Sequence, residues 1–345
     1  MRKKDFETFV RERRWSWILT YTFIAILILM VFFFSLKRVP GYSIKESIVF
    51  GTRVKIVVSS KLAGRIIEAI LQDMRRIDRK FDPYDERSVI YRINNSNGEW
   101  VEVDNEVLFV LKKALYFAEI TGGAFDPTVG VLVKLWGFND GNYRIPSDEE
   151  IRDALKHVGY ENVEISGNKV RLKNGALLDL GGIAKGYAVD RAIQIAKRYD
   201  QKATGFIDAG GDIGIIGPKF GGSDWVIGIR NPRYKENSDE TIDVVYMKDG
   251  AIATSGDYER YFIKDGKRYH HIFNPKTGYP SHGIISATVI AQSCADADAL
   301  ATAIFNLGLD YSLMYIPRFG GQAFIVTEDS KIHRTKGFGY FEKPH

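Results

Sequence analysis

The run from His270 to Pro280 reads His-His-Ile-Phe-Asn-Pro-Lys-Thr-Gly-Tyr-Pro, and it places two imidazoles, an amide and a hydroxyl within eleven positions. Such a run is unsuited to a core. The Asn-Pro pair opens a turn, Gly278 allows a positive φ, and Pro280 excludes a central strand. A rigid loop of this kind could hold His271 and Thr277 against a ligand. Alone, this pattern would be weak evidence for a functional site. Three other segments, at 121–128, 177–190 and 296–302, also combine residue types that suit a ligand site better than a core.

Asp298 and Thr302 are four positions apart in a segment with a helical pattern, so they share one face of the helix, and the apolar residues lie on the other. A carboxylate beside a hydroxyl offers oxygen ligands, which suit Mg²⁺ or Ca²⁺ better than zinc. The alternative is a solvated helix face, with Asp296 as the N-cap.

The segment 177–187, Leu-Leu-Asp-Leu-Gly-Gly-Ile-Ala-Lys-Gly-Tyr, is an apolar strand that runs through two glycines into a helix. Glycines let the backbone approach a ligand, and a helix N-terminus presents free N–H groups to an anion. The pattern is neither a Walker A nor a GxGxxG motif. A tight turn with Lys185 in solvent would explain it equally well. Residues 121–128, with Asp126 before a proline, and the glycine pair in 206–212 have the same two interpretations: ligand contact, or a cap and a bulge.

Around these residues the patterns predict helices alternating irregularly with mostly antiparallel strands, which is an α+β fold. A capping box, Ser147 with Glu150, marks one helix start. Helices are expected at 62–79, 106–121, 147–158, 185–199 and 296–307, and strands at 47–60, in short pieces within 162–180, and at 204–208, 213–217, 224–230, 241–247, 251–255, 259–264, 284–290, 312–326 and 331–340.

The N-terminal residues predict a membrane anchor. A basic tail, 1–14, precedes an apolar segment, 15–36, which is long enough to span most of a bilayer of about 30 Å and starts with two tryptophans. The positive-inside rule puts the tail in the cytoplasm. After a linker, 37–48, the domain 49–345 would then lie outside the cytoplasm, held by a single pass in the plasma (inner) membrane. A cleaved signal peptide is the alternative, although the apolar run is long for one.

The net charge of +5 does not indicate a nucleic-acid-binding protein. The tail 1–14 carries six basic and three acidic residues, and Lys37 and Arg38 supply the rest, so residues 39–345 are formally neutral. The single cysteine, Cys294, permits no internal disulfide and is too far from the N-terminus for a lipoprotein.

Taken in order, these segments resemble the FAD:protein FMN transferase family of ApbE-like proteins. The matching pieces extend from about residue 49 to 310, and two positions depart from the usual pattern: Phe50 stands where Met is common, and Asp82 stands where Ser is common. The pieces are Gly51-Thr52, the segment 81–84 leading to Ser88 and Asn94, TGGAFDPTVG at 121–130, LDLGGIAKGYAVD at 178–190, HIFNPKTGYP at 271–280 and DADALATA at 296–303.

The resemblance implies an ApbE-like (T-fold-like) domain that binds FAD and a divalent metal, usually Mg²⁺. Such proteins transfer FMN to a Thr or Ser hydroxyl of a target protein and release AMP. By family correspondence, Asp298 and Thr302 would bind the metal through side chains and Gly182 through its carbonyl, and His271 would activate the acceptor hydroxyl or contact the phosphates. FAD contacts would map to Phe50, Tyr84, Ala124, Phe125, Asp126, Asp179, Lys185 and Ile272.

Two other functions remain open at this point. The same site could hydrolyse FAD to FMN and AMP, since water can replace the acceptor hydroxyl. A membrane-anchored protein that only stores FAD is the other possibility, although a passive flavoprotein has no need of a metal beside the pyrophosphate. The sequence does not identify the acceptor protein.

Overall fold

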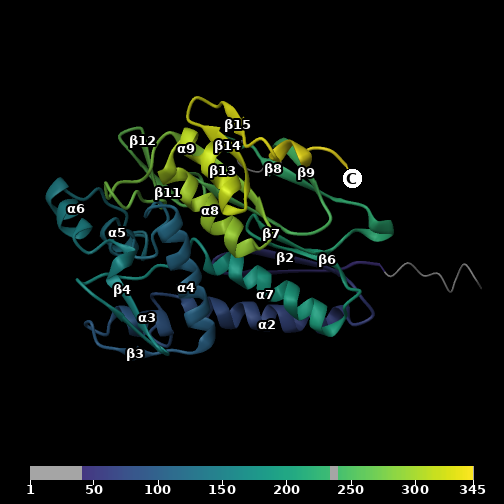
Figure 1. The fold of residues 1–345 in the computed structure, drawn as a ribbon, viewed down its shortest axis with the longest axis horizontal. Coiled ribbons are helices and arrows are strands. Elements are labelled where there is room, and N and C mark those ends of the chain that lie inside the picture. Colours follow the sequence, from purple (N-terminus) through teal and green to yellow (C-terminus); the bar gives the residue numbers. More distant parts are fainter. Residues whose placement is uncertain (1–40, 234–239, 345) are drawn as a thin grey trace, which may run out of the picture. The chain divides into compact units, whose positions relative to one another are not determined.

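A computed structural model describes residues 41–233 and 240–344. All of these residues except Gly41 belong to one compact unit, Tyr42–His345. Its centre is an eight-stranded sheet whose neighbouring strands are all antiparallel (Figure 1). In sheet order the strands are β1 (Ser43–Val49), β2 (Thr52–Ser59), β6 (Thr204–Ala209), β7 (Asp212–Gly217), β10 (Ala251–Gly256), β13 (Ile284–Ala291), β14 (Gln322–Thr327) and β15 (Ile332–Arg334).

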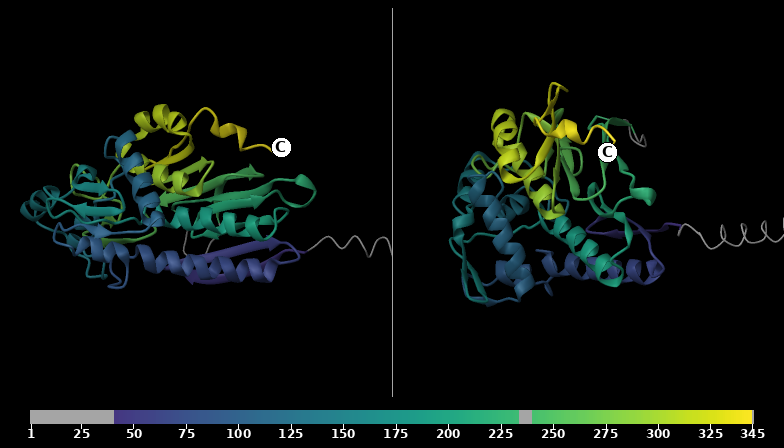
Figure 2. Two further views of the ribbon diagram at one scale, coloured as in Figure 1. Left: turned by 60° about the horizontal axis from the view of Figure 1, so that its bottom comes forward. Right: turned by 45° about the vertical axis from the view of Figure 1, so that its right-hand side comes forward.

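Three helices, α2 (Ala63–Phe81), α7 (Ala184–Tyr199) and α8 (Cys294–Leu307), pack side by side on one face of this sheet (Figures 1 and 2). Helix α2 shows why: Ile66, Ile70, Met74 and Ile77 recur every three or four residues and are at most 1% exposed. The other face is covered by the hairpin β8 (Trp225–Arg230) and β9 (Thr241–Met247), which forms a separate core with β14.

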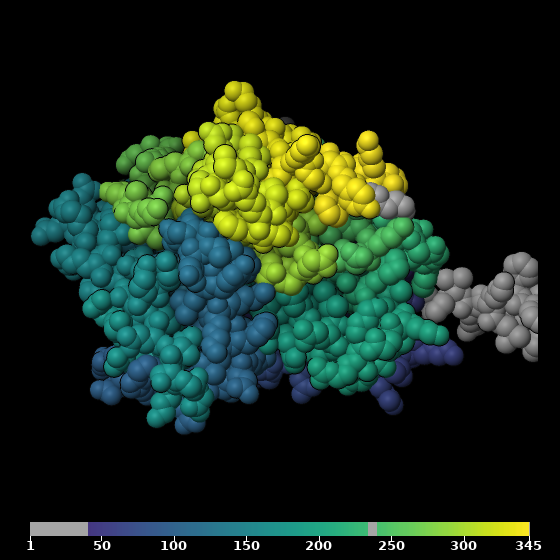
Figure 3. Space-filling model, viewed as in Figure 1, coloured from purple at the N-terminus to yellow at the C-terminus, as the bar shows by residue number. Residues whose placement is uncertain are grey.

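A helical region completes the unit beside the sheet. It contains α3 (Val89–Asn94), α4 (Asn105–Ile120), α5 (Gly130–Leu135) and α6 (Asp148–Leu155), a small sheet in the order β3 (Val101–Glu102), β5 (Lys169–Leu172), β4 (Val163–Ser166), and the hairpin β11 (Tyr261–Lys264) and β12 (Lys267–His270). Helix α9 (Leu309–Tyr315) follows α8. The space-filling view shows the blue and teal residues of this region packed directly against the C-terminal residues near α8 (Figure 3).

The predicted α+β class with antiparallel sheets is confirmed, as are the five predicted helices and the capping box at Ser147. Three predicted strands and one predicted helix cap differ from the structure. The single strand 47–60 is two strands, because Phe50 and Gly51 both have positive φ and reverse the chain. Residues 312–326 begin in α9, and only Ile332–Arg334 of 331–340 is a strand. Helix α8 is capped by Ser293, not Asp296. Helices α3 and α5 are not predicted from the sequence.

The predicted tail 1–14 and anchor 15–36 lie outside the described residues, as do residues 37–40 of the linker 37–48. From Ser43 on, the predicted linker belongs to β1, so that part of the prediction is wrong. None of the helices within 41–233 and 240–344 combines the length and hydropathy of a membrane span.

Candidate active site

A cavity of about 560 Å³ opens where the glycine-rich loops meet the ends of α2, α7 and α8. The twelve residues assigned to the site by the family resemblance all line it, although they come from positions as far apart as 50 and 302. Thr277, which was also expected to face a ligand, is exposed and does not border the cavity. They are Phe50, Tyr84, Ala124, Phe125, Asp126, Asp179, Gly182, Lys185, His271, Ile272, Asp298 and Thr302.

One wall of the cavity is rich in oxygen atoms. Thr302 lies against Gly182, where an added Cβ would be 3.1 Å from Thr302 Oγ1. The Thr302 hydroxyl is also 3.2 Å from Ser255 Oγ. One turn back along α8, Asp298 is 5% exposed and its Oδ2 accepts a 3.0 Å hydrogen bond from the Gly186 backbone N–H. A carboxylate, a hydroxyl and a nearby backbone carbonyl are the ligands that Mg²⁺ prefers, so this wall fits such an ion.

Lys185 and Asp212 form an ion pair beside Asp298. The Asp212 side chain is 1% exposed, whereas that of Lys185 is 23% exposed and lines the cavity. Burial and the neighbouring Asp298 charge raise the pKa of Asp212 well above its usual value, against the opposite effect of Lys185. Burial also raises the pKa of Asp298. Burial alone would lower the pKa of Lys185, but the two carboxylates outweigh it and raise that pKa. The site therefore concentrates two carboxylates and one ammonium in a buried place.

Helices α7 and α8 touch through backbone at Gly186. An added Cβ there would lie 2.5 Å from the Cys294 carbonyl oxygen and 2.8 Å from Ala295 Cα. Further along α7, Asp190 accepts hydrogen bonds from the backbone N–H groups of Cys294 (2.7 Å) and Ala295 (3.0 Å) at the start of α8. Burial raises the pKa of Asp190 to about 6. These contacts fix α8, and hence Asp298, relative to the N-terminal turn of α7.

The two adjacent histidines occupy different surroundings, as expected for an extended segment. His270 is 4% exposed, and its Nε2 lies 2.8 Å from the Ser281 carbonyl oxygen. His271 lines the cavity, and its Nδ1 lies 3.2 Å from the Arg260 carbonyl oxygen. A carbonyl only accepts hydrogen bonds, so Nδ1 of His271 carries the proton and Nε2 keeps its lone pair. Burial within the cavity walls, and then the Arg260 charge, lower the pKa of His271 well below its usual value, which keeps the ring neutral at pH 7.

Asp126 shapes the loop that borders the cavity. It is 7% exposed, and its Oδ1 accepts from the backbone N–H (2.8 Å) and hydroxyl (2.6 Å) of Thr128. Its Oδ2 accepts from the Tyr160 N–H at 3.0 Å. Burial raises the pKa of Asp126 despite these bonds. Because both carboxylate oxygens already accept hydrogen bonds within the loop, Asp126 fixes the loop backbone at the cavity wall and does not present a free charge to a ligand.

The cavity mouth is formed by shorter turns. Phe50 has φ of 55°, and its N–H donates to Asp78 Oδ2 at 2.9 Å, which holds the β1–β2 turn against α2. Asp179 Oδ1 accepts from the Gly181 N–H at 2.8 Å and so tightens the double-glycine turn. The Tyr84 ring is 44% exposed at this mouth, where an aromatic ring could stack on a planar ligand.

A protein-family model described as the ApbE family matches residues 50–325. The chain belongs to this family. A FAD:protein FMN transferase of Treponema pallidum is 32% identical over 323 residues, which cover 87% of this chain and 88% of that protein. The crystal structure of the ApbE protein of Thermotoga maritima is 52% identical, covers 88% of this chain and 99% of its own, and superposes with a TM-score of 0.85. The apo Pseudomonas stutzeri flavinyl transferase ApbE is 27% identical with a TM-score of 0.77 over 87% of this chain and 96% of its own.

Several residues of this ApbE-family site are not identified from the sequence, and four of them have side chains that matter for its geometry. Ser255, Arg260 and Asn306 line the cavity, and Asp212 lies behind it. Asn306 had a signal, since it continues the i, i+4 series of Asp298 and Thr302. Its amide donates to the carbonyls of Ala124 (2.8 Å) and Phe273 (3.0 Å) and joins two loops of the site. Ser255 lies near the end of β10, Arg260 follows that strand, and Asp212 follows a glycine pair, so each had only a weak local signal.

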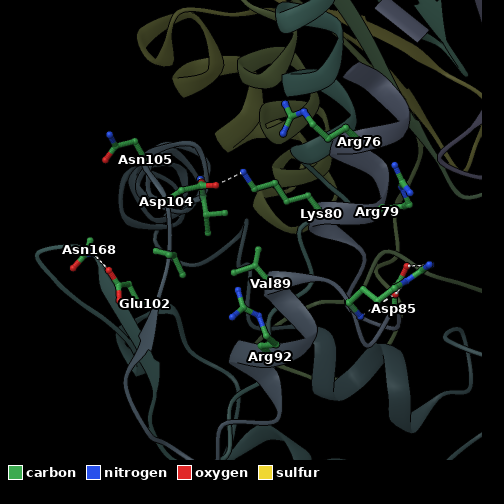
Figure 4. Close-up of a pocket in the computed structure, with 13 residues that line it drawn as sticks. Arg76, Arg79, Lys80, Asp85, Val89, Arg92, Glu102, Asp104, Asn105 and Asn168 are labelled. Carbon is green, nitrogen blue, oxygen red and sulfur yellow. Dashed lines mark hydrogen bonds and ion pairs between the residues drawn. The ribbon is translucent and has the colours of Figure 1, made fainter. Parts of the chain in front are cut away.

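A second cavity, of about 920 Å³, lies between the C-terminal part of α2, helix α3 and the start of α4, and none of the predicted site residues lines it. Its wall is charged, and several of its charges are paired within it (Figure 4). Lys80 pairs with Asp104, Arg87 with Asp85, and the Asn168 amide donates to Glu102 at 2.6 Å. Arg79 and Arg92 also line this cavity, but no histidine and no glycine turn does, so it lacks the imidazole and the close backbone approach found in the first one.

Proposed function

We propose that this chain is a metal-dependent FAD:protein FMN transferase, which cleaves the FAD pyrophosphate, transfers FMN to a Thr or Ser hydroxyl of a target protein and releases AMP. One observation carries the proposal: a neutral imidazole with a free Nε2 shares a cavity with an oxygen-rich wall fit for a divalent cation. The names of the curated relatives, FAD:protein FMN transferases, point to the same reaction.

The metal would be held by Asp298 and Thr302 through their side chains and by Gly182 through its carbonyl, with Mg²⁺ as the expected ion. The fit rests on chemistry, because each donor is a hard oxygen, and on space, because a Cβ at Gly182 would lie only 3.1 Å from Thr302 Oγ1. When bound, the ion neutralises phosphate charge, including charge that develops on the departing AMP.

FAD would be bound by the rest of the cavity. Phe50 and Tyr84 offer aromatic surface at the mouth, and Ala124, Phe125, Asp126 and Ile272 offer a fixed loop wall. Asp179 and Lys185 flank the double-glycine turn, where the backbone can approach the pyrophosphate. A cavity of about 560 Å³ holds part of a dinucleotide of this size, so we expect some of FAD to extend through the mouth.

His271 would act as the general base. Its Nε2 takes the proton of the acceptor hydroxyl as the oxygen forms a bond to the phosphorus of the FMN half. The bond from that phosphorus to the bridging oxygen breaks, and AMP leaves with that oxygen. The lowered pKa of His271 supports the role, because the ring remains neutral and able to accept a proton at pH 7.

We further propose that residues 15–36 anchor the domain in the plasma (inner) membrane, with the catalytic part outside the cytoplasm. The support is the basic tail before an apolar run of sufficient length. No nucleic-acid partner is proposed. The partners are FAD and an acceptor protein carrying the flavinylated Thr or Ser.

The test is to incubate the full chain in detergent with FAD, Mg²⁺ and a candidate acceptor, and to measure the intact mass of the acceptor and the AMP released. Acceptor mass gained by one FMN, with equal AMP, supports transfer. Release of free FMN and AMP without acceptor labelling supports the alternative, an FAD pyrophosphatase. Unchanged FAD with every acceptor would indicate a passive FAD-binding protein and refute the proposal. A chelator-treated sample is the control for metal dependence.

A further inference from the structure

Asp212 is the residue behind the active-site cavity whose chemistry remains unexplained. It is 0% exposed, and it does not border the cavity, so it cannot touch FAD or the acceptor directly. Its Oδ2 accepts from Lys185 Nζ, its Oδ1 is buried without a hydrogen-bond donor among the described residues, and its carboxyl group lies against the carboxyl group of Asp298. Burying a carboxylate lowers the stability of the fold unless a cation offsets its charge. The ion pair with Lys185 therefore calls for a functional explanation.

Lys185 is the cation between two carboxylates. Its ammonium lies in the field of both Asp212 and Asp298, but its hydrogen bond goes to Asp212. Asp298 is held instead by a neutral donor, the Gly186 backbone N–H, at 3.0 Å. Lys185 and Gly186 are consecutive, so the first turn of α7 presents a neutral donor to one carboxylate and an ammonium to the other.

We propose that Asp212 is a positioning residue that binds the Lys185 ammonium and so keeps it from pairing with Asp298, which leaves Asp298 free to bind the divalent cation. This inference rests on the proposed metal site. Without Asp212, the nearest strong acceptor for the ammonium is Asp298, and a metal ion would then have to displace a buried, charge-assisted hydrogen bond.

The strand arrangement is suited to this task. Asp212 is the first residue of β7, directly after the glycine pair Gly210-Gly211, and β7 packs against α7. Gly210 lines the cavity, so the turn reaches the site while the next strand carries Asp212 beneath it. The carboxylate is therefore placed by the sheet, which is rigid, and not by a mobile loop.

The test is a double-mutant cycle on metal binding, independent of catalysis. The full chain in detergent, without FAD, is titrated with Mn²⁺, and free Mn²⁺ is followed by electron paramagnetic resonance. Asp212→Asn keeps the shape of the side chain and removes its charge, so the freed ammonium should weaken Mn²⁺ binding by about 10–100-fold. Adding Lys185→Met to that variant removes the competing ammonium and should restore most of the affinity. Lys185→Met alone should bind Mn²⁺ at least as tightly as wild type.

Each result decides between explanations. Unchanged Mn²⁺ affinity in Asp212→Asn overturns the inference. The inference is also overturned if Asp212→Asn weakens Mn²⁺ binding and the added Lys185→Met substitution does not restore the affinity, because Asp212 would then act on the metal itself. If Asp212→Asn fails to fold, the single Lys185→Met variant still decides, since a loss of affinity there contradicts competition. Wild-type protein that binds no Mn²⁺ would refute the proposed metal site and the inference with it. Asp73→Asn, a charge removal in an arginine-paired carboxylate on α2, is the matched control and should bind Mn²⁺ normally.

Discussion

Replacing Gly186 with alanine tests whether close contact between α7 and α8 positions the metal-binding carboxylate. The new Cβ would lie 2.5 Å from the Cys294 carbonyl oxygen, 2.7 Å from the Cys294 carbonyl carbon and 2.8 Å from Ala295 Cα. All three are backbone atoms, so no side-chain rotation can relieve the contact, and the helices must separate. Separation would stretch or break the 3.0 Å hydrogen bond from the Gly186 N–H to Asp298.

The magnitude follows from three terms. Overpacking typically costs about 1–3 kcal/mol. Loss of a hydrogen bond to a charged group costs about 1.5–3 kcal/mol. Alanine gains about 1 kcal/mol over glycine within a helix. We therefore expect Gly186→Ala to lower the free energy of unfolding by about 1.5–5 kcal/mol and to weaken metal binding, because Asp298 loses its fixed orientation.

The assay is urea unfolding in the presence of a chelator, followed by the Mn²⁺ titration on the folded variant. Gly64→Ala is the matched control, since Gly64 lies in α2 with nothing within 4 Å of an added Cβ. It should be neutral or stabilising by up to about 1 kcal/mol. A Gly186→Ala protein as stable as wild type, with normal metal affinity, would refute the reasoning that backbone contact between α7 and α8 aligns the site.

Five further outcomes are expected. Asp298→Ala should abolish FAD cleavage at limiting Mg²⁺ while FAD affinity falls less, and Thr302→Ala should be milder because water can replace a neutral hydroxyl; equal effects in a steady-state comparison would contradict this ranking. His271→Ala should slow single-turnover transfer by about 10²–10⁴-fold with little change in the FAD dissociation constant. Because the pKa of His271 is lowered, the wild-type transfer rate should stay constant as pH falls from 8 through the usual histidine range near 6.5, and decline only in more acidic buffer where the ring gains its proton; a decline centred at or above 6.5 would exclude His271 as a base with a lowered pKa. His270→Ala should instead lower stability by about 2–3 kcal/mol, since it removes a buried ring and leaves the Ser281 carbonyl unpaired, and a variant that unfolds at the wild-type urea concentration would contradict that structural role. Protease added outside spheroplasts should degrade the domain and spare the tail before residues 15–36, whereas full protection of the domain would contradict the proposed topology.

Local periodicity predicted the parts of this site that lie on single helices. The spacing of Asp298 and Thr302 placed both on one face of α8, and that face lines the cavity. The opposite placement of His270 and His271 followed from the alternation of an extended chain. Residue types and spacing, with the family resemblance, thus identified twelve of the residues that line the cavity.

Pairings between distant segments could not be predicted in the same way. Lys185 and Asp212 are 27 positions apart, and their contact depends on how β7 packs against α7. The turn at Phe50 was hidden because valine and isoleucine alternate on both sides of it, so the pattern continued through the reversal. Helix α9 was mistaken for a strand since its short aromatic run has no distinguishing period.

The cavity draws its walls from positions between 50 and 306, and the carboxylate on α8 is among the last of them. A chain that leaves the ribosome or a translocation channel therefore has no flavin site until nearly the whole domain has emerged and α8 has docked on α7. Premature FAD capture by a partly folded chain is excluded by this order of assembly. Flavin loading would then report that α8 has docked on α7. Bound FAD would also hold segments from residue 50 to residue 306 together, because its binding free energy adds to the stability of the native state.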